Sequence, residues 1–195
     1  DISEYVPLST CTTLRIGGTA RAVIYPKNDL ALSQIMNILL KKRVPYKIIG
    51  KGSNLLCNDA EFNGIVIRLD RYFNEYYFDE NKLVAQAGCS IISLSYEAMK
   101  KGLSGLEFAS GIPATVGGVT YMNAGAYKSN MKDVIDRVYI YRDGKCEWIT
   151  NQECQFEYRK SIFHMQRDWI ILGVQFSLTE KPVDEIREIM DDRRE

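Results

Sequence analysis

A short segment with two glycines, Gly50 to Leu55, has the residue types needed to bind a phosphate group. Glycine accepts positive φ angles, so consecutive backbone amides can turn toward one anion. The side chains of Ser53 and Asn54 add hydrogen-bond donors. The segment, the first glycine loop, consists of Gly50, Lys51, Gly52, Ser53, Asn54 and Leu55. It matches neither common nucleotide motif, because Leu55 replaces the third glycine of G-x-G-x-x-G and no G-x-x-x-x-G-K-[ST] run occurs. A phosphate cradle and a plain structural turn both stay open.

A second glycine-rich stretch is longer, apolar and free of charged residues from Gly111 to Tyr127. Its small side chains would let a large, flat molecule approach the backbone closely. The pair Gly117-Gly118 would open a helix whose N-terminus points at a phosphate; tight helix packing is the alternative. The second glycine loop comprises Gly111, Ile112, Pro113, Ala114, Thr115, Val116, Gly117 and Gly118, and Asn123, Ala124 and Gly125 follow it. Two such loops in one chain favour a dinucleotide cofactor over coincidence.

A third signal is an arginine, Arg159, which stands between Tyr158 and Lys160. A guanidinium beside an aromatic ring and the hydroxyl of Ser161 can bind a carboxylate with two parallel hydrogen bonds. The alternative is a surface ion pair, and the sequence alone favours that alternative. The acids Glu61, Asp191 and Asp192 are interpreted as solvated rather than as paired catalytic carboxylates.

The single histidine, His164, limits the chemistry further. It excludes a histidine-rich metal centre and any mechanism that needs two histidines. We expect a structural or surface role for it. The five cysteines, at positions 11, 57, 89, 146 and 154, are odd in number and contain no C-x-x-C pair. This pattern argues against a disulfide framework or a zinc site and favours a reducing cytoplasm.

Composition narrows the class of protein. The 195 residues carry 25 Lys+Arg and 25 Asp+Glu, so the formal charge is zero and a basic nucleic-acid-binding protein is not expected. With 46% hydrophobic residues the chain has material for a core. No apolar run approaches the roughly 20 residues of a membrane span, and no signal peptide is evident.

The first third of the chain predicts a small α/β unit around the first glycine loop. A mostly apolar run at 20–25, with a β-branched pair, predicts a strand that stops at Pro26. Asn28 caps a predicted helix that ends near Arg43. Residues 46–49 form a short strand that leads into Gly50. A further strand is expected at 64–69.

The rest of the chain predicts an α+β arrangement. A helix is predicted to begin after its cap Ser90, to run to Lys101 and to end at Gly102. The pair Asp143-Gly144 predicts a β-hairpin. The expected strands cover residues 82–87, 134–141, 145–149 and 169–178. The aromatic residues at 72–78 are expected to pack on a sheet. Pro182 opens an amphipathic helix to Glu195 whose apolar stripe either docks on the preceding domain or begins a further one.

Together these residues resemble the UDP-N-acetylenolpyruvoylglucosamine reductase family, flavoenzymes of bacterial peptidoglycan synthesis. The likeness runs from about Thr12 to Leu178. The motifs that carry it, in order, are TLRIGGTA at 13–20, GKGSNLL at 50–56, GLSGLEF at 102–108, SGIP at 110–113, TVGG at 115–118, MNAGAY at 122–127 and YRKSIF at 158–163.

The resemblance implies an α+β fold of the PCMH type, with FAD held between two subdomains. Residues 1–69 would form the first FAD-binding subdomain and 70–181 the second, while 182–195 would begin a C-terminal substrate-binding domain. It also implies NADPH as co-substrate and a UDP-sugar substrate, in a cytoplasmic enzyme without nucleic-acid or membrane partners; a monomer is favoured.

The resemblance also assigns residues. The first glycine loop would meet the pyrophosphate of FAD, and the second, with Asn123, Ala124 and Gly125, would line the flavin. Arg159 would be the catalytic arginine and, with Tyr158, would contact the substrate. Ala114 and Lys128 stand where the family commonly has glycine.

A proton-donating serine and a late glutamate of the family are expected beyond residue 195. The chain as given is therefore expected to bind FAD with little or no turnover. Two other readings stay open. One is a different FAD-dependent oxidoreductase, such as a sugar or alcohol oxidase, although His164 lies outside both glycine loops, which argues against a histidyl–flavin link. The other is a non-enzymatic nucleotide-binding module.

Overall fold

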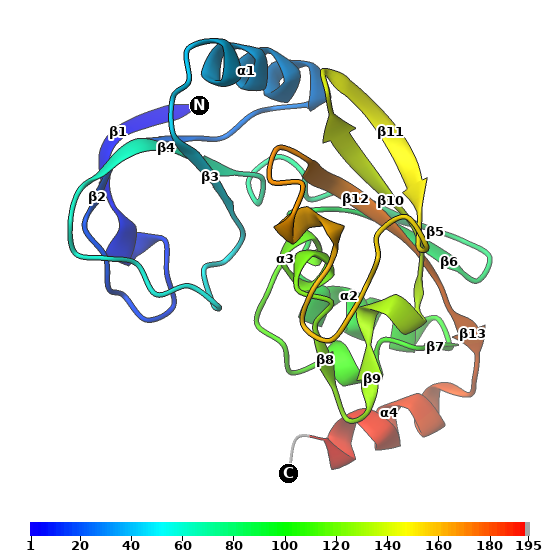
Figure 1. Ribbon diagram of the computed structural model, residues 1–195. Helices are drawn as coiled ribbons and strands as arrows, with labels where there is room; N and C mark the ends of the chain where they lie inside the picture. The colour runs from blue at the N-terminus through cyan, green and yellow to red at the C-terminus, as the bar shows by residue number, and fades with distance from the viewer. Residues whose placement is uncertain (194–195) are drawn as a thin grey trace.

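The N-terminal third forms a four-stranded sheet in the computed structural model, which describes residues 1–193 (Figure 1). Its strands lie in the order β1-β2-β4-β3. β4 runs parallel to both β2 and β3, whereas β1 is antiparallel to β2. The strands span β1 Ile2–Pro7, β2 Thr19–Ile24, β3 Tyr46–Ile49 and β4 Phe62–Arg68. The strands predicted near 20, 46 and 64 are confirmed, and β1 is an addition.

Helix α1 (Asp29–Lys41) connects β2 to β3 and lies over the top of the molecule in Figure 1. The predicted cap is confirmed, because the Asn28 side chain accepts a hydrogen bond of 2.9 Å from the amide of Ala31. The helix buries Leu32, Met36 and Leu39 at a spacing of three to four residues, which places them on one face.

The remaining strands build a five-stranded antiparallel sheet in the order β11-β10-β12-β6-β5. They span β5 Tyr76–Asp79, β6 Lys82–Gln86, β10 Ile135–Arg142, β11 Lys145–Thr150 and β12 Ile170–Ser177. The predicted hairpin at Asp143-Gly144 joins β10 to β11, with positive φ at both turn residues. The aromatic patch packs as expected only in part. Phe73 is buried, and Tyr72 and Phe78 pack against the core. Tyr76 and Tyr77, in the edge strand β5, are exposed.

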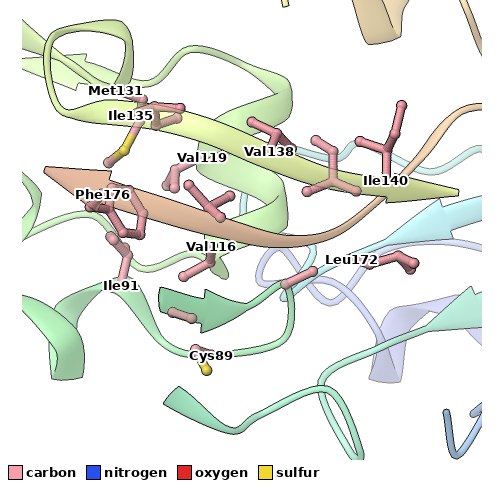
Figure 2. Close-up of a cluster of buried hydrophobic side chains, with 14 of the residues drawn as sticks. Cys89, Ile91, Val116, Val119, Met131, Ile135, Val138, Ile140, Leu172 and Phe176 are labelled. Atoms are coloured by element: carbon pink, nitrogen blue, oxygen red, sulfur yellow. The ribbon is translucent and has the colours of Figure 1, made fainter. Parts of the chain in front are cut away.

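Two helices supply the core against this sheet. α2 (Ile91–Lys100) and α3 (Val116–Tyr121) bury Ile91, Val116 and Val119. Figure 2 shows these side chains gathered beside Val138 and Phe176, which come from β10 and β12. The predicted ends of α2 are confirmed: the Ser90 hydroxyl accepts from the amide of Ser93 at 3.5 Å, and Gly102 has a φ of +69°.

Several short elements escaped the sequence analysis. Two-residue strands form the pairs β7 (Leu103–Ser104) with β13 (Thr179–Glu180) and β8 (Gly125–Ala126) with β9 (Ser129–Asn130). Short 3-10 helices cover Leu8–Thr10, Glu107–Ala109, Met131–Asp133 and Ile162–His164. The α+β class with several sheets is as predicted.

The C-terminal helix α4 (Val183–Asp192) docks on the preceding part of the chain. Its buried residues Ile186 and Met190 pack against Met99 of α2. The apolar stripe therefore docks on the preceding domain, as the first alternative has it, and the start of a further domain here stays a prediction. The helix was expected to reach Glu195, which lies outside the described residues.

Candidate cofactor site

The two glycine loops face each other across the boundary between the two sheets. A Cβ atom built on Gly50 would lie 2.5 Å from the Thr115 hydroxyl oxygen. The two segments are therefore so close that a residue with a side chain at position 50 would force Thr115 to move. The Lys51 Nζ donates to the hydroxyl of Ser90 at 3.3 Å, and Ser90 forms an isolated β-bridge with Thr115. Strand β3 thus brings the first loop to the caps of α2 and α3.

The first glycine loop is pressed against residues 11–13. Gly52 has a φ of +70°, and a Cβ there would lie 2.1 Å from the carbonyl oxygen of Cys11. The Gly52 carbonyl accepts from the amide of Thr13 at 3.2 Å. Within residues 1–193, no protein acceptor takes a hydrogen bond from the backbone amides of residues 51–55. The loop therefore combines a fixed backbone with available donors, which suits a phosphate group.

The second glycine loop uses its amides differently. The amide of Val116 donates to Cys89 O at 2.9 Å, and that of Gly117 donates to Ala87 O at 2.8 Å. The amide of Gly118 donates to the hydroxyl of Thr115, the N-cap of α3, at 3.3 Å. The prediction that Gly117-Gly118 opens a helix is confirmed, since both residues lie in the first turn of α3. The amides of residues 116–118 donate to protein oxygens, and a role of this helix start in phosphate binding stays a prediction.

Close packing, the alternative explanation for the glycines of the second glycine loop, applies to some of them but not to all. A Cβ on Gly117 would lie 3.1 Å from the Cβ of Ala87, whereas one on Gly111 would meet no atom within 4 Å. Ala114 does not adopt a positive φ, in keeping with its methyl group. Lys128, the other departure from the family pattern, has a φ of +64°. Glycine would adopt that conformation without strain.

Arg159 sits in a tight turn with a φ of +54°. The amides and carbonyls of Glu157 and Lys160 bond to each other at 3.0 and 3.2 Å and close the turn. The guanidinium donates to the carbonyl of Gly125 at 2.7 Å and lies 5.7 Å from the ring centre of Tyr158, whose surface is 89% exposed. In the described part of the chain Arg159 forms no ion pair, so the alternative that sequence favoured is not observed.

Both polar atoms of the Asn123 side-chain amide form hydrogen bonds. Its Nδ2 donates to Glu157 O at 2.8 Å, and its Oδ1 accepts from the amide of Lys132 at 2.9 Å. Nearby, the hydroxyl of Ser161 donates to Tyr121 O at 2.6 Å. Sequence analysis missed these contacts, since nothing in the local pattern indicates which distant carbonyl lies opposite. A flavin-lining role for Asn123, Ala124 and Gly125 stays a prediction.

His164 has the structural role that was predicted. Its Nδ1 accepts from the amide of Ser161 at 3.3 Å, and its ring lies 4.2 Å from that of Tyr121. The described residues contain no cluster of metal-ligand side chains. Nor does any helix among them have the length and apolar character to cross a membrane. All five cysteines are free thiols.

Two tyrosine–aspartate hydrogen bonds join the first sheet and its helix to the second sheet. Tyr46 of β3 donates to Asp168 at 2.5 Å, and Tyr139 of β10 donates to Asp29 of α1 at 3.1 Å. Partial burial and then the bond to Asp29 raise the pKa of Tyr139 to about 12. The pKa of Tyr46 is raised by the same causes, with Asp168 as its partner.

Comparison with known proteins places this geometry in context. Residues 20–150 match the FAD binding domain family. The UDP-N-acetylenolpyruvoylglucosamine reductase of Anoxybacillus flavithermus is 39% identical over 186 residues, which cover 95% of this chain and 62% of that protein. The reductase of Bacillus licheniformis is 41% identical over 186 residues, with 95% and 61% covered.

Solved structures give the same picture. The crystal structure of UDP-N-acetylenolpyruvylglucosamine reductase from Thermus caldophilus superposes with a TM-score of 0.85 at 35% identity, covering 100% of this chain and 70% of that one. An alkyldihydroxyacetonephosphate synthase shares the fold alone. It superposes with a TM-score of 0.61 at 16% identity, and the match covers 85% of this chain and 33% of the synthase chain. The chain spans about three fifths of the length of the curated relatives it matches.

Proposed function

Because this chain belongs to the UDP-N-acetylenolpyruvoylglucosamine reductase family and contains its FAD-binding domain, we propose that it forms the flavin-binding part of such a reductase. The reaction is the NADPH-dependent reduction of UDP-N-acetylglucosamine enolpyruvate to UDP-N-acetylmuramate. The reaction belongs to peptidoglycan synthesis and takes place in the cytoplasm.

The observation that carries the proposal is the pair of facing loops. Among the described residues no protein acceptor takes a hydrogen bond from the amides of residues 51–55, and the Lys51 cation reaches Ser90 at the cap of α2. The loop would therefore offer the pyrophosphate of FAD backbone donors, and Lys51 would add positive charge. No side chain can fill the space at Gly50 or Gly52 without displacing a neighbour. The uncharged residues 111–118 lie opposite, where a flat ring needs a surface of small side chains.

The subdomain boundaries follow the same proposal. The first sheet ends at Arg68 and the second begins at Tyr76, which supports a first FAD-binding subdomain of residues 1–69 and a second of 70–181. Residues 182–195 would begin the substrate-binding part of the enzyme. The docking of α4 on Met99 would fix its orientation.

Arg159 is the residue to which we assign the chemistry of this chain. Bound FAD would supply the transfer of hydride from NADPH to the substrate. The enolpyruvyl group gains negative charge beside its carboxylate as it is reduced. A fixed guanidinium aimed at that charge stabilises the transition state more than the ground state. Its planar donors also match the carboxylate of the substrate, and the exposed ring of Tyr158 lies on the same turn.

Replacing Arg159 tests this assignment. Because the loss of one such donor typically costs a factor of about 100 to 1,000, Arg159→Ala in the complete enzyme is expected to lower kcat by that amount. The FAD content has to be measured alongside, because the guanidinium donates to the carbonyl of Gly125, a residue predicted to line the flavin. Stopped-flow absorbance would follow reduction of the flavin by NADPH and its reoxidation by the enolpyruvyl substrate.

The outcomes separate the candidate functions. A kcat within twofold of the wild-type value would contradict the role of Arg159. Turnover of an alcohol or sugar with oxygen, without response to the enolpyruvyl substrate, would favour the oxidase reading. Protein that never takes up flavin would favour a binding module.

A further inference from the structure

The turn that carries Arg159 cannot hold the guanidinium in place by itself. Arg159 has a left-handed backbone, which costs a non-glycine residue free energy, and Tyr158 beside it is 89% exposed. Within the turn, Glu157 and Lys160 are joined by their reciprocal backbone bonds and by an exposed ion pair of 3.5 Å between their side chains. A group that stabilises a developing charge has to be positioned before the reaction, so a loose turn would forfeit much of its effect.

Neighbouring residues supply the missing support at three points. The carbonyl of Gly125 accepts from the Arg159 guanidinium at 2.7 Å, and the amide of Asn123 donates to the carbonyl of Glu157 at 2.8 Å. At the end of the turn, the Ser161 hydroxyl donates to the carbonyl of Tyr121 at 2.6 Å. Alternate residues of the 121–125 segment therefore each hold one residue of the 157–161 segment.

Asn123 is the central support, because it is the one that links the turn to a third element. Its side chain is buried, with 5% of its surface exposed. The Lys132 amide can donate only to an oxygen and the Glu157 carbonyl can accept only from the NH₂ group, so these two partners fix the orientation of the side-chain amide. The 3-10 helix at Met131–Asp133 thereby anchors the turn.

We propose that Asn123 is a positioning residue for Arg159, with Ser161 as a second support. Asn123 acts through the carbonyl of Glu157 and does not itself touch the substrate. This inference rests on the proposed function, since it needs Arg159 to take part in the reaction.

The replacement Asn123→Asp tests the proposal with little change of shape. The carboxylate can still accept from the Lys132 amide, but it cannot donate to Glu157 O and instead faces that oxygen with negative charge. A displacement of about 1 Å at a reacting group can cost about 100-fold in rate, so kcat of the FAD-loaded complete enzyme is expected to fall by about 10- to 100-fold. The KM for NADPH should not change.

Asn151→Asp is the matched control. Asn151 also donates from a half-buried amide to main-chain carbonyls, those of Lys132 and Ile135, at 2.9 and 2.7 Å. It bonds to the same 3-10 helix but not to the turn of Arg159. The same chemical change there is expected to leave kcat within about twofold of wild type. Hydrogen exchange at the amides of Glu157 and Lys160 should accelerate in Asn123→Asp and not in Asn151→Asp.

A double-mutant cycle separates positioning from general structural damage. If Asn123 acts through Arg159, then Asn123→Asp lowers kcat in the wild-type background but has no further effect in the Arg159→Ala background. Equal losses in both backgrounds would overturn the proposal, as would wild-type kcat and exchange rates in Asn123→Asp.

If that variant does not fold, Ser161→Ala, which removes one hydroxyl, enters the same cycle in its place. Should Arg159→Ala alone retain full activity, the proposed role of Arg159 fails and this inference fails with it. Should Arg159→Ala lose activity while Asn123→Asp does not, only this inference fails.

Discussion

The two glycine loops are both rich in small residues but use their backbone amides in opposite ways. In the first, the amides of residues 51–55 have no protein acceptor among the described residues, and the carbonyl of Gly52 ties the loop to Thr13. In the second, the amides of residues 116–118 all donate to protein oxygens. The first loop is therefore suited to bind an anion, whereas the second is a closed surface on which a ring can lie.

The difference shows that a glycine-rich run is not one kind of signal. Gly52 is needed because of its left-handed backbone and its contact with the carbonyl of Cys11. Gly117 is needed because α3 packs closely on Ala87. Gly111 meets neither requirement, since it has open space around it and no positive φ. Replacing these residues one at a time should therefore give graded effects.

The largest effect is expected for Gly52→Ala. The added methyl group overlaps the Cys11 carbonyl, and the left-handed conformation costs roughly 1–2 kcal/mol for a residue with a Cβ. The loop has to move, so the dissociation constant for FAD should rise at least about tenfold, the equivalent of 1.4 kcal/mol. Titration of the apoprotein with FAD, followed by quenching of flavin fluorescence, measures it.

Gly111→Ala is the matched control for that experiment. The new methyl group would meet no atom within 4 Å, so the free energy of unfolding should change by no more than about 0.5 kcal/mol. Equal losses of FAD affinity in both variants would remove the distinction between the loops.

A smaller effect is expected for Thr115→Ala. Its hydroxyl caps α3 by accepting from the Gly118 amide, and the loss of such a cap costs about 1 kcal/mol of stability. Denaturant unfolding of the apoprotein should show that loss, and Thr115→Ser, which keeps the hydroxyl, should not. FAD affinity should fall less than in Gly52→Ala. If FAD affinity falls as much in Thr115→Ala as in Gly52→Ala, the start of α3 contributes more to anion binding than its amides, which already donate to protein oxygens, would suggest.

The smallest effect concerns pH and the hydrogen bond between Tyr139 of β10 and Asp29 of α1, which joins the two parts of the chain that carry the loops. The pKa of Tyr139 rises to about 12 in the folded protein, above its usual value near 10, because of burial and the bond to Asp29. The folded state therefore holds this proton more tightly than the unfolded state. The resulting stability is fully present below pH 10 and is lost as the pH rises toward 12.

Thermal unfolding between pH 8 and 11 tests this linkage. Tyr139→Phe should show a shallower loss of Tm above pH 10 than the wild-type protein. Tyr77→Phe, on the exposed edge strand, should keep the wild-type slope. Identical slopes in all three proteins would show that the bond between α1 and β10 adds nothing to stability.

Sequence predicted the regular elements well because their signals are local. Asn28 caps α1, Gly102 ends α2 and Asp143-Gly144 turns between β10 and β11, as the residue types require. β1 was missed because its residues are mostly exposed and carry no alternating pattern. The β8–β9 turn was missed because Tyr127 and Lys128 adopt left-handed conformations that their types do not favour.

The site was predictable in its parts but not in its contacts. The glycine loops and Arg159 stood out by composition and by resemblance to the family. The occupied amides of α3 depend on Ala87 and Cys89, which only the folded sheet brings near. The bond from Asn123 to Glu157 likewise joins residues 34 positions apart. Such pairings come from topology, which no local pattern encodes.

The most direct test of the account compares FAD with riboflavin, which lacks the pyrophosphate and the adenosine, in calorimetric titrations of the apoprotein. If the amides of residues 51–55 bind the pyrophosphate, FAD should bind at least about 100-fold more tightly than riboflavin, as expected for two or more hydrogen bonds to a charged group. Gly52→Ala should remove most of that difference and leave riboflavin binding unchanged. Failure of the wild-type apoprotein to bind FAD, or an equal loss for both ligands in the variant, would contradict the account.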